Sequence, residues 1–493
     1  MKPRPFIAAA LSIVAMLMCL VLRSQPFAIA QGGVTIRVSI ASDGTQGNGA
    51  SVNSAMSADG RYVAFVSSAT NLVAGDTNGY DDVFVHDRQT GQTTRVSVHS
   101  NGAQGNNRSS LDAMPAISAD GRYVAFVSRA SNLVDGDTAN AYDVFVHDRQ
   151  TAQTTRVSIH SNGAQGDASA SYIAECAISA DGRYVAFSSH ASTLIGTDTN
   201  SDSQCDVNCD RNGAQDIFIH DRQTAQTSRV SISSAGAEAD SDSYWPAISA
   251  DGRYVAFYSR ATNLVSGDTN ETWDVFVHDR QTGQTTRVSV SSNGTQANAE
   301  SRGLVISGDG RYVAFESQAS NLVSLDYNGA LDIFVHDRQT GQTTRASVAS
   351  DGAEANLGGR YPAISADGRY VAFVSQSNNL VSGDTRNFFD VFRHDQETGE
   401  TIRVSVASDG TQGSGDSGWS YMRSMPSLSA EGRSVAFHSS AHNLVTNDTN
   451  GTEDVFVHEP GAEPTPTPTA TTAPTPTPTA TPQFRVYLPL ILR

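Results

Sequence analysis

Lysine is almost absent from this chain of 493 residues, where Lys2 is the only one. Lys2 lies in a segment that reads as a cleaved leader, so the mature chain has no lysine for Schiff-base or nucleophilic chemistry. Lysine and arginine together number 33 against 51 acidic residues, which gives a formal net charge of −18. An acidic surface of this kind argues against nucleic acid and anionic membranes as partners.

Helical periodicity and catalytic signatures are missing as well. Apolar residues of the mature chain alternate at period two, with many β-branched and aromatic residues, which is typical of strands. The chain lacks the Gly-x-Ser-x-Gly elbow of α/β-hydrolases, and its acidic residues recur from repeat to repeat without a singular pair. We therefore predict that the protein is not an enzyme and has no catalytic residues.

Cysteine is scarce, with four in the chain. Cys19 lies in the leader. Cys205 and Cys209 lie close together in an insertion of the third repeat, and in an exported protein this spacing favours a loop-closing disulfide. Cys176 lies at the start of an expected inner strand, where we predict a buried free thiol.

Residues 1–30 have the pattern of a secretory signal peptide. Lys2 and Arg4 precede an apolar run, and Ala28-Ile29-Ala30 supplies small residues at the cleavage position. An uncleaved membrane anchor is the alternative. Cleavage removes three basic residues and no acid, which moves the net charge from −18 to −21. We expect a secreted protein, extracellular or held at the cell surface, with no membrane span in the mature chain.

The composition changes again near the C-terminus. Residues 461–483 form a Pro/Thr-rich linker, which is extended and cannot build a core. Residues 484–493 form a short apolar tail that ends in Arg493 and is too short to span a bilayer as a helix. This arrangement resembles the C-termini of secreted bacterial proteins, some of them tied to the cell surface. We predict attachment to the cell envelope through the tail, with a tail of no consequence as the alternative.

Between these ends one pattern recurs seven times. It reads SADGRYVAF at 57–65, and its copies follow at intervals of 58 to 70 residues. About 25 residues after each copy comes a second module, such as DVFVHDRQTGQTTRVSV at 82–98. A fixed long period indicates one supersecondary unit stacked many times.

Each repeat predicts four strands, PAIS, RYVAFVS, DVFVHD and TTRVSV, with tight turns after the first and third. Four antiparallel strands repeated around an axis make a β-propeller. A TTRVSV-like strand precedes the first repeat at 34–42, and the last repeat ends at 454–460 without one. The N-terminal strand should therefore complete the last blade, which gives an all-β, seven-bladed propeller over residues 31–460 that we expect to be a monomer.

The repeated motifs carry a family resemblance. SADGRYVAF followed by DVFVHD resembles the repeats of TolB-like, WD40-like propellers of the PD40 family, over roughly residues 34–459. The loop pattern N-L-V-x-G-D-T-N resembles exported bacterial proteins of this kind. The resemblance implies a propeller fold. It does not extend to a TolB-like partnership with envelope lipoproteins, because Ala replaces the favoured Pro and seven blades are expected.

Within each repeat the short turns are nearly constant and the longer loops vary, so we expect the long loops to form the functional face. A histidine recurs once per repeat, as His86 does in the first copy. A catalytic histidine has no reason to recur in this way, and we predict a structural His–Asp hydrogen-bonded pair.

The long loops also suggest metal binding. Oxygen-bearing side chains at alternate positions, followed by a further acid, suit Ca²⁺, with metal-free turns as the alternative. The predicted ligands are Asp76, Asn78 and Asp82 in an ordinary loop, and Asp198, Asn200, Asp202, Asp206 and Asp210 in and beside the third-repeat insertion.

Side chains that do not repeat stand out in the variable loops. These candidate ligand-binding residues are Tyr244, Trp245, Trp273, Arg302, Arg360, Phe388, Trp419, Tyr421 and Arg423. Aromatic rings combined with arginine and acids suit sugars or peptides. We therefore predict a non-catalytic module at the cell surface that binds protein or carbohydrate. The alternative is a polysaccharide hydrolase or lyase that uses loop carboxylates.

Overall fold

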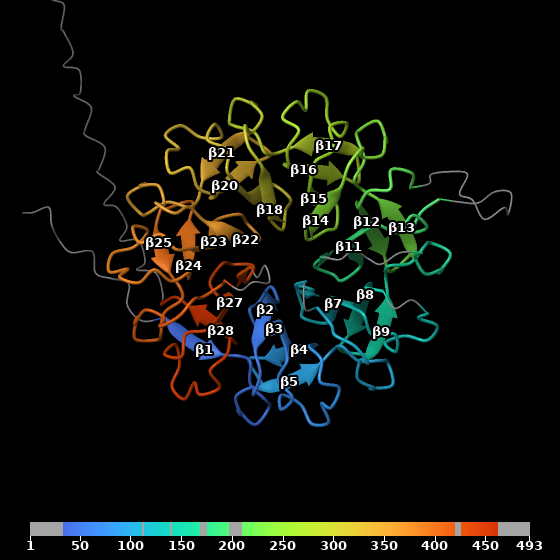
Figure 1. Ribbon diagram of the computed structural model, residues 1–493, viewed down its shortest axis with the longest axis vertical. Coiled ribbons are helices and arrows are strands. Elements are labelled where there is room, and N and C mark those ends of the chain that lie inside the picture. The colour runs from blue at the N-terminus through green and yellow to red at the C-terminus, as the bar shows by residue number, and fades with distance from the viewer. Residues whose placement is uncertain are drawn as a thin grey trace, which may run out of the picture. The chain divides into compact units, whose positions relative to one another are not determined.

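The structure is a computed structural model that describes residues 33–110, 113–138, 141–167, 175–196, 210–419 and 425–461. Its β-strands form seven four-stranded antiparallel sheets. The sheets are arranged as blades around a central axis (Figure 1). The predicted seven-bladed β-propeller is confirmed.

The blades follow one another along the chain. Blade 1 has β2 (Ser51–Met56), β3 (Tyr62–Ser67), β4 (Asp82–Asp87) and β5 (Gln92–Arg95). Blade 2 has β6 (Ala116–Ile117), β7 (Tyr123–Ser128), β8 (Asp143–Asp148) and β9 (Gln153–Arg156). Blade 3 has β10 (Cys176–Ile178), β11 (Tyr184–Ser189), β12 (Asp216–Asp221) and β13 (Gln226–Arg229). Blade 4 has β14 (Ser243–Ile248), β15 (Tyr254–Ser259), β16 (Asp274–Asp279) and β17 (Gln284–Arg287).

The remaining blades repeat this order. Blade 5 has β18 (Ser301–Ile306), β19 (Tyr312–Ser317), β20 (Asp332–Asp337) and β21 (Gln342–Arg345). Blade 6 has β22 (Arg360–Ile364), β23 (Tyr370–Ser375), β24 (Asp390–Asp395) and β25 (Thr401–Arg403). Blade 7 has β26 (Ser427–Leu428), β27 (Val435–Ser439), β28 (Asp454–Glu459) and β1 (Val34–Arg37).

The two middle strands of each blade are buried on both faces, because neighbouring blades cover them from either side. In β3 only Tyr62 is partly exposed, and β4 is buried throughout. Phe65 and Phe84 lie opposite each other in the register, with ring centroids 5.9 Å apart. Equivalent phenylalanine pairs recur around the ring, so every blade contributes the same aromatic layer to the core.

The outer strand is shorter than the sequence pattern suggests. We expected TTRVSV to be extended throughout, but β5 ends at Arg95. Beyond it, the Ser97 hydroxyl donates to Asp82 Oδ1 (2.5 Å) and Val98 bridges to Gln104. The strand ends there because the Ser97 hydroxyl is bonded to the buried Asp82 carboxylate.

The repeated histidine is structural, but the predicted His–Asp pair is wrong. His86 Nδ1 lies 2.9 Å from the hydroxyl of Thr93, and that hydroxyl donates to Ile40 O. Asp87 instead accepts two hydrogen bonds from Arg61, of 2.8 and 2.7 Å. Burial lowers the pKa of His86 to about 4, so the ring is neutral at pH 7 and its Nδ1–H donates to threonine.

The N-terminal strand closes the ring, as predicted. β1 pairs antiparallel with β28, with Val34 opposite Glu459. It also brings the side-chain contacts of an outer strand, because Thr35 Oγ1 lies 2.8 Å from His458 Nδ1 and Arg37 lies 3.3 Å from Asp454. The first described strand and the last blade therefore form one unit.

Each blade has two different ends. The short turns after the first and third strands lie at one end, here called the turn end, and the longer connections lie at the other, the loop end. At the turn end Ala58 N–H donates to Ala119 O of blade 2 at 3.0 Å. The same bond repeats from blade to blade until Ala430 N–H donates back to Ala58 O at 2.8 Å. These bonds make a closed circle around the axis.

Side chains reinforce this circle. The Tyr62 ring lies between the guanidinium groups of Arg61 (4.7 Å) and Arg149 of blade 2 (4.4 Å). It also packs against Gly121 of blade 2, where a Cβ would lie 2.1 Å from the ring and φ is +72°. Only glycine fits that turn, so the repeated Asp-Gly is required by inter-blade packing as well as by turn geometry.

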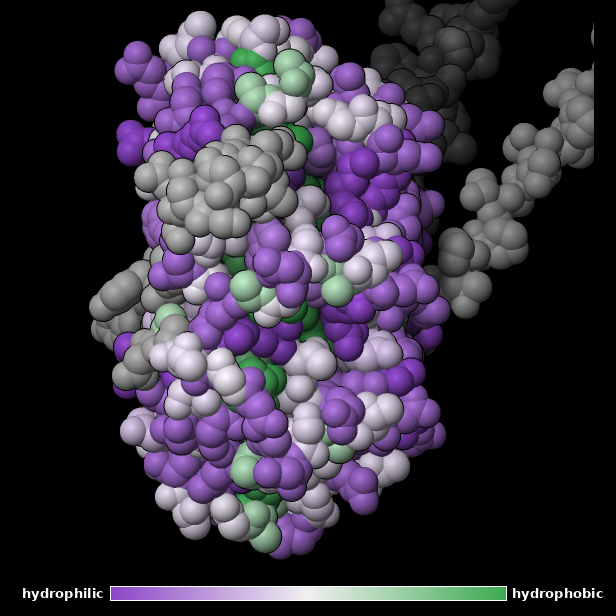
Figure 2. All heavy atoms as spheres, turned by 90° about the vertical axis from the view of Figure 1, so that its right-hand side faces the viewer, coloured by the Kyte–Doolittle hydropathy of each residue, from purple (hydrophilic) through white to green (hydrophobic). Residues whose placement is uncertain are grey.

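Both described ends of the ring lie at the turn end. Val34 is the first residue of β1 and pairs with Glu459, the last residue of β28. The rim seen in Figure 2 is mainly hydrophilic, and its apolar side chains lie in small separate patches. No helix within the described ranges has the length and apolar character needed to cross a bilayer.

Deletion of residues 33–42 should open the ring. The loss of β1 exposes the edge of β28 and removes the Thr35 and Arg37 contacts, so we expect aggregation and a lower melting temperature. Size-exclusion chromatography and thermal melts test this. A synthetic 33–42 peptide should restore solubility by adding back the missing strand. An equally soluble, equally stable deletion variant would contradict closure by this strand.

Candidate ligand-binding face

The loop end combines a constant scaffold with variable side chains. Three repeat-equivalent positions lie there: one on the inner strand, one near the end of the second strand and one just before the third. For blades 1, 4, 5 and 6, in that order, the first position holds Val52, Tyr244, Arg302 and Arg360. The second position, which pairs with the first, holds Val66, Tyr258, Glu316 and Val374 in the same order. The third is Asp81, Trp273, Leu331 or Phe389. Identical backbone therefore presents different chemistry in each blade.

Blade 4 presents an aromatic cluster. Tyr244, Tyr258 and Trp273 occupy its three positions, with ring centroids 5.2 to 5.8 Å apart. The exposed Arg260 guanidinium lies 5.4 Å from the Trp273 ring centroid. Burial and the neighbouring Asp242 carboxylate raise the pKa of Tyr244, so its hydroxyl keeps its proton at neutral pH.

Blade 5 presents charge at the same positions. Arg302 lies 3.1 Å from the buried Glu316 carboxylate and 3.3 Å from Glu300. The second oxygen of Glu316 accepts the backbone N–H of Tyr361 in blade 6 at 3.3 Å. The arginine is thus neutralised from two sides, and the Glu316 carboxylate also links blade 5 to blade 6.

Blade 6 presents aromatic rings again, together with Trp419 from the following connection. Phe389 and Trp419 stack at 4.3 Å, and Tyr361 lies 5.9 Å from Trp419. The Arg360 guanidinium lies 5.7 Å from the Trp419 ring centroid. We give the name blade 4–6 face to the loop-end cluster formed by Tyr244, Tyr258, Arg260, Trp273, Glu300, Arg302, Glu316, Arg360, Tyr361, Phe389 and Trp419.

The structure brings most of the predicted ligand-binding residues to this face. Tyr244, Trp273, Arg302, Arg360 and Trp419 belong to it, and Phe388 is half-buried beside Phe389. Trp245 differs, because it is 7 % exposed and packs into the core beside the central channel. Tyr421 and Arg423 lie outside the described residues.

Sequence reasoning missed several members of the face, and a signal for them existed. Tyr258 and Glu316 replace the valine of YVAFVS, so they looked like ordinary strand residues. Tyr361 and Glu300 lie beside arginines that we did identify. Alignment of the repeats would have identified Tyr258 and Glu316, because blades 1, 2 and 6 have valine at that position. The positions of Tyr361 and Glu300 vary from blade to blade, so alignment carries no such signal for them.

The central channel is apolar. A cavity of about 350 Å³ is lined by the inner strands of the blades and includes Trp245, Met56 and Met425. The buried Glu175 and Cys176 also line it. Cys176 forms no disulfide, as predicted, and burial raises the pKa of its thiol to about 12, so it is not reactive. Cys205 and Cys209 lie outside the described residues.

The Asp/Asn loops contain a cation of their own. Arg95 Nη1 lies 3.1 Å from both Asp76 Oδ1 and Asp82 Oδ2, and Asn78 donates to Asp82 at 3.0 Å. The same arginine lies between two aspartates in every blade. Guanidinium supplies the positive charge that these loops need, and calcium at Asp76, Asn78 and Asp82 stays a prediction.

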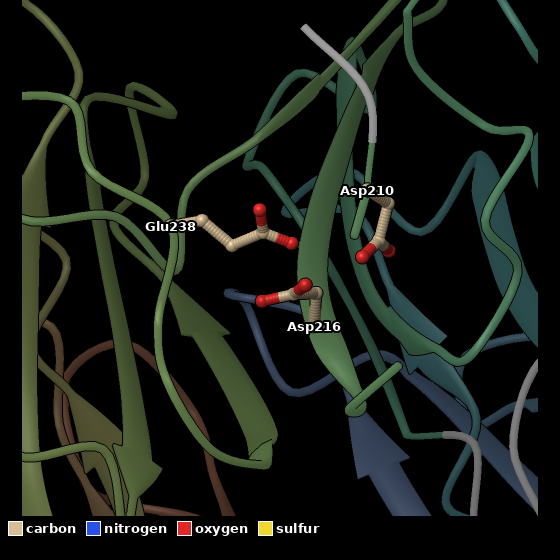
Figure 3. A group of neighbouring side chains, drawn as sticks. All are labelled: Asp210, Asp216 and Glu238. Atoms are coloured by element: carbon tan, nitrogen blue, oxygen red, sulfur yellow. The ribbon is translucent and has the colours of Figure 1, made fainter. Parts of the chain in front are cut away.

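Blade 3 has one acid too many for this arrangement. Glu238 replaces the glutamine found in most blades, as Glu354 does in blade 5. Asp210, Asp216 and Glu238 lie close together (Figure 3), and each lies within 3.4 Å of Arg229 Nη1. Their carboxylate oxygens lie within 4.8 Å of one another. Burial, reinforced by the Asp216 charge, raises the pKa of Asp210 to about 7. The other predicted metal ligands, Asp198, Asn200, Asp202 and Asp206, lie outside the described residues.

Comparisons with known proteins identify the fold only. No family model and no curated protein matches the sequence. An oligogalacturonate lyase in complex with manganese is similar with a TM-score of 0.53 and 11% identity, over 88% of this chain and 94% of its own.

Two TolB structures are more distant. TolB from Acinetobacter baumannii has a TM-score of 0.37 and 14% identity, over 72% of this chain and 63% of its own. A putative TolB from Agrobacterium tumefaciens has a TM-score of 0.38 and 16% identity, over 75% and 94%. The chain is a seven-bladed propeller by its own strand order, and its structural similarity to these proteins is distant.

The acidic cluster of blade 3 predicts a pH-dependent variant. Asp210 binds its proton up to about pH 7 when folded but only to about pH 4 when unfolded, so stability falls as pH rises through this window. Glu238→Gln removes one charge and keeps an acceptor for Arg229. We expect a gain of about 1 kcal/mol in unfolding free energy at pH 8 and little at pH 5.

Denaturant melts at the two pH values measure this difference. Gln296→Glu, the reverse change at the equivalent site of blade 4, should lower stability at pH 8. Equal gains from Glu238→Gln at both pH values would show that charge repulsion is not the cause.

Proposed function

We propose that this protein is an exported, non-catalytic binding module that holds a carbohydrate through the blade 4–6 face. The observation that carries the proposal is the change of chemistry at repeat-equivalent positions of a constant scaffold. In blade 1 the first two positions hold Val52 and Val66, which are sufficient for packing. In blade 4 the partly exposed Tyr244 replaces the first valine, and in blade 6 the partly exposed Tyr361 follows Arg360. Fold does not name a function, so the side chains carry the argument.

The chemistry of the face fits sugars. Trp273 and Trp419 are large, partly exposed rings held in place by other rings. Trp273 meets Tyr244 and Tyr258 edge-on, and Trp419 stacks on Phe389. Rigid aromatic rings with a few polar groups around them are the usual elements of a recognition site. Flat rings suit the C–H faces of pyranose units, and the neighbouring arginines supply hydrogen-bond donors. A protein partner is the other outcome that the test below resolves.

The position of the chain ends supports display at a surface. β1 begins and β28 ends at the turn end. A tether through residues 461–493, or through a retained leader, would leave the loop end directed away from its attachment point. The repeat motifs likewise support placing the chain among TolB-like, WD40-like repeat proteins of the exported bacterial type.

An enzyme acting on polysaccharide is the alternative. It would need a carboxylate that is free to act as acid or base. Within the described part of the blade 4–6 face, Glu300 and Glu316 are both ion-paired with Arg302. This pairing suits structure and orientation better than proton transfer.

Substitution of the exposed rings tests the proposal. Trp273→Ala and Trp419→Ala should each weaken binding on a glycan array at least tenfold, because each removes a stacking surface. Tyr80→Ala, which removes an exposed ring from blade 1, should not change binding. Binding of peptides and no glycan would identify a protein partner, and shortening of a bound polymer would favour the enzyme.

Calcium is a separate proposal. If the third-repeat insertion and the Asp-Thr-Asn loops bind Ca²⁺, the ion should raise the melting temperature by mass action, and Mg²⁺ should substitute poorly. Asp198→Ala with Asp202→Ala should reduce that rise. Coincident melting curves in calcium and in chelator, with no calcium by elemental analysis, would remove the metal.

A further inference from the structure

We infer that the ligand of the loop end is an acidic polysaccharide, in which carboxylates bind arginines that are stacked on aromatic rings. This inference rests on the proposed function and specifies the chemical class of its ligand. Three such pairs occur at the loop end: Arg129 on Tyr142 in blade 2 (5.1 Å), Arg260 on Trp273 (5.4 Å) and Arg360 on Trp419 (5.7 Å). We call Arg129, Arg260 and Arg360 the stacked arginines.

The stacked arginines differ from the arginines that the scaffold uses. The outer-strand arginines lie between two aspartates, as Arg95 does, and the turn arginines bind one aspartate with two bonds, as Arg61 does. None of the stacked arginines has an acidic partner among the residues that the structure describes. Arg149 at the turn end also lies on a tyrosine without an ion pair, but its guanidinium donates to Gly121 O at 2.7 Å. The stacked arginines differ from it, because their side chains form no hydrogen bond to a described residue.

The side-chain donors of the stacked arginines are not used by described residues. Each guanidinium carbon lies 5.1 to 5.7 Å from a ring centroid. The N–H donors of a guanidinium lie in the plane of the group. Two parallel donors match the two oxygens of a carboxylate. A uronic acid unit offers both halves of the match, because it carries a carboxylate on a pyranose ring whose C–H face can lie on an aromatic side chain.

Blade 5 limits where the anionic groups can bind. Arg302 occupies the position equivalent to Arg360 but is already paired with Glu316 and Glu300. A carboxylate approaching that arginine would meet two others. On the blade 4–6 face the anion sites are therefore at Arg260 and Arg360, on either side of blade 5, and Arg129 of blade 2 is a further site of the loop end. Separate sites on one face favour a polymer over a single sugar, since linked units bind with a higher effective concentration.

Isothermal titration calorimetry with alginate oligomers tests the inference, with chelator present because alginate binds calcium itself. The matched neutral probe is the same material after reduction of its carboxyl groups. The full-length secreted protein should bind alginate at least tenfold more tightly than the reduced polymer. Arg260→Gln and Arg360→Gln should each cost about tenfold toward alginate, the expected loss for one charged hydrogen bond, and little toward the reduced polymer.

Arg386→Gln is the control variant, because it removes the same charge from an exposed residue of the blade 6 connection that stacks on no described ring. It should leave alginate binding unchanged, and circular dichroism melts should show all variants folded. Equal binding of alginate and its reduced form, or an equal loss with Arg386→Gln, would overturn the acidic class and leave the proposed function standing. Binding to neither polymer, nor to any glycan on the array, would overturn both.

Discussion

A closed circle of seven backbone hydrogen bonds is the constraint on which the rest of the molecule depends. Each bond joins the first turn of one blade to the same turn of the next, with N–O distances of 2.8 to 3.0 Å. Such a circle closes only when every blade has the same tilt and the same spacing. The tyrosine that packs on the glycine of the next turn fixes that spacing, which explains why the turn sequence hardly changes between repeats.

Because the turn end fixes the position of each blade, the side chains at the loop end can differ between blades. The inner and second strands pair in the same register in blades 1, 4 and 5, including the irregularity near the loop end. Residues placed just before that irregularity can change without effect on the circle, and they change from valine to tyrosine to arginine. The chemical variation between blades is thus found at one end, while both described chain termini leave from the other.

Charged side chains are paired locally throughout the scaffold. Every outer-strand arginine lies between two aspartates, and each turn arginine from Arg61 to Arg369 holds an aspartate of the third strand. Against this regular pairing, two kinds of departure stand out. One is the third carboxylate, Glu238 beside Arg229 in blade 3 and Glu354 beside Arg345 in blade 5. The other is the set of stacked arginines, whose side chains form no hydrogen bond to a described residue.

The sequence by itself determined the strands, the number of blades and the closure by the N-terminal strand. These follow from local alternation and from counting repeats, and both properties are present in any one copy or in the order of copies. Tertiary structure alone decided that His86 pairs with Thr93, that Arg95 takes the place between Asp76 and Asp82, and that Tyr361, Phe389 and Trp419 meet. Those contacts join different strands or successive blades, and the strand pattern says nothing about which side chains a blade-to-blade rotation brings within reach.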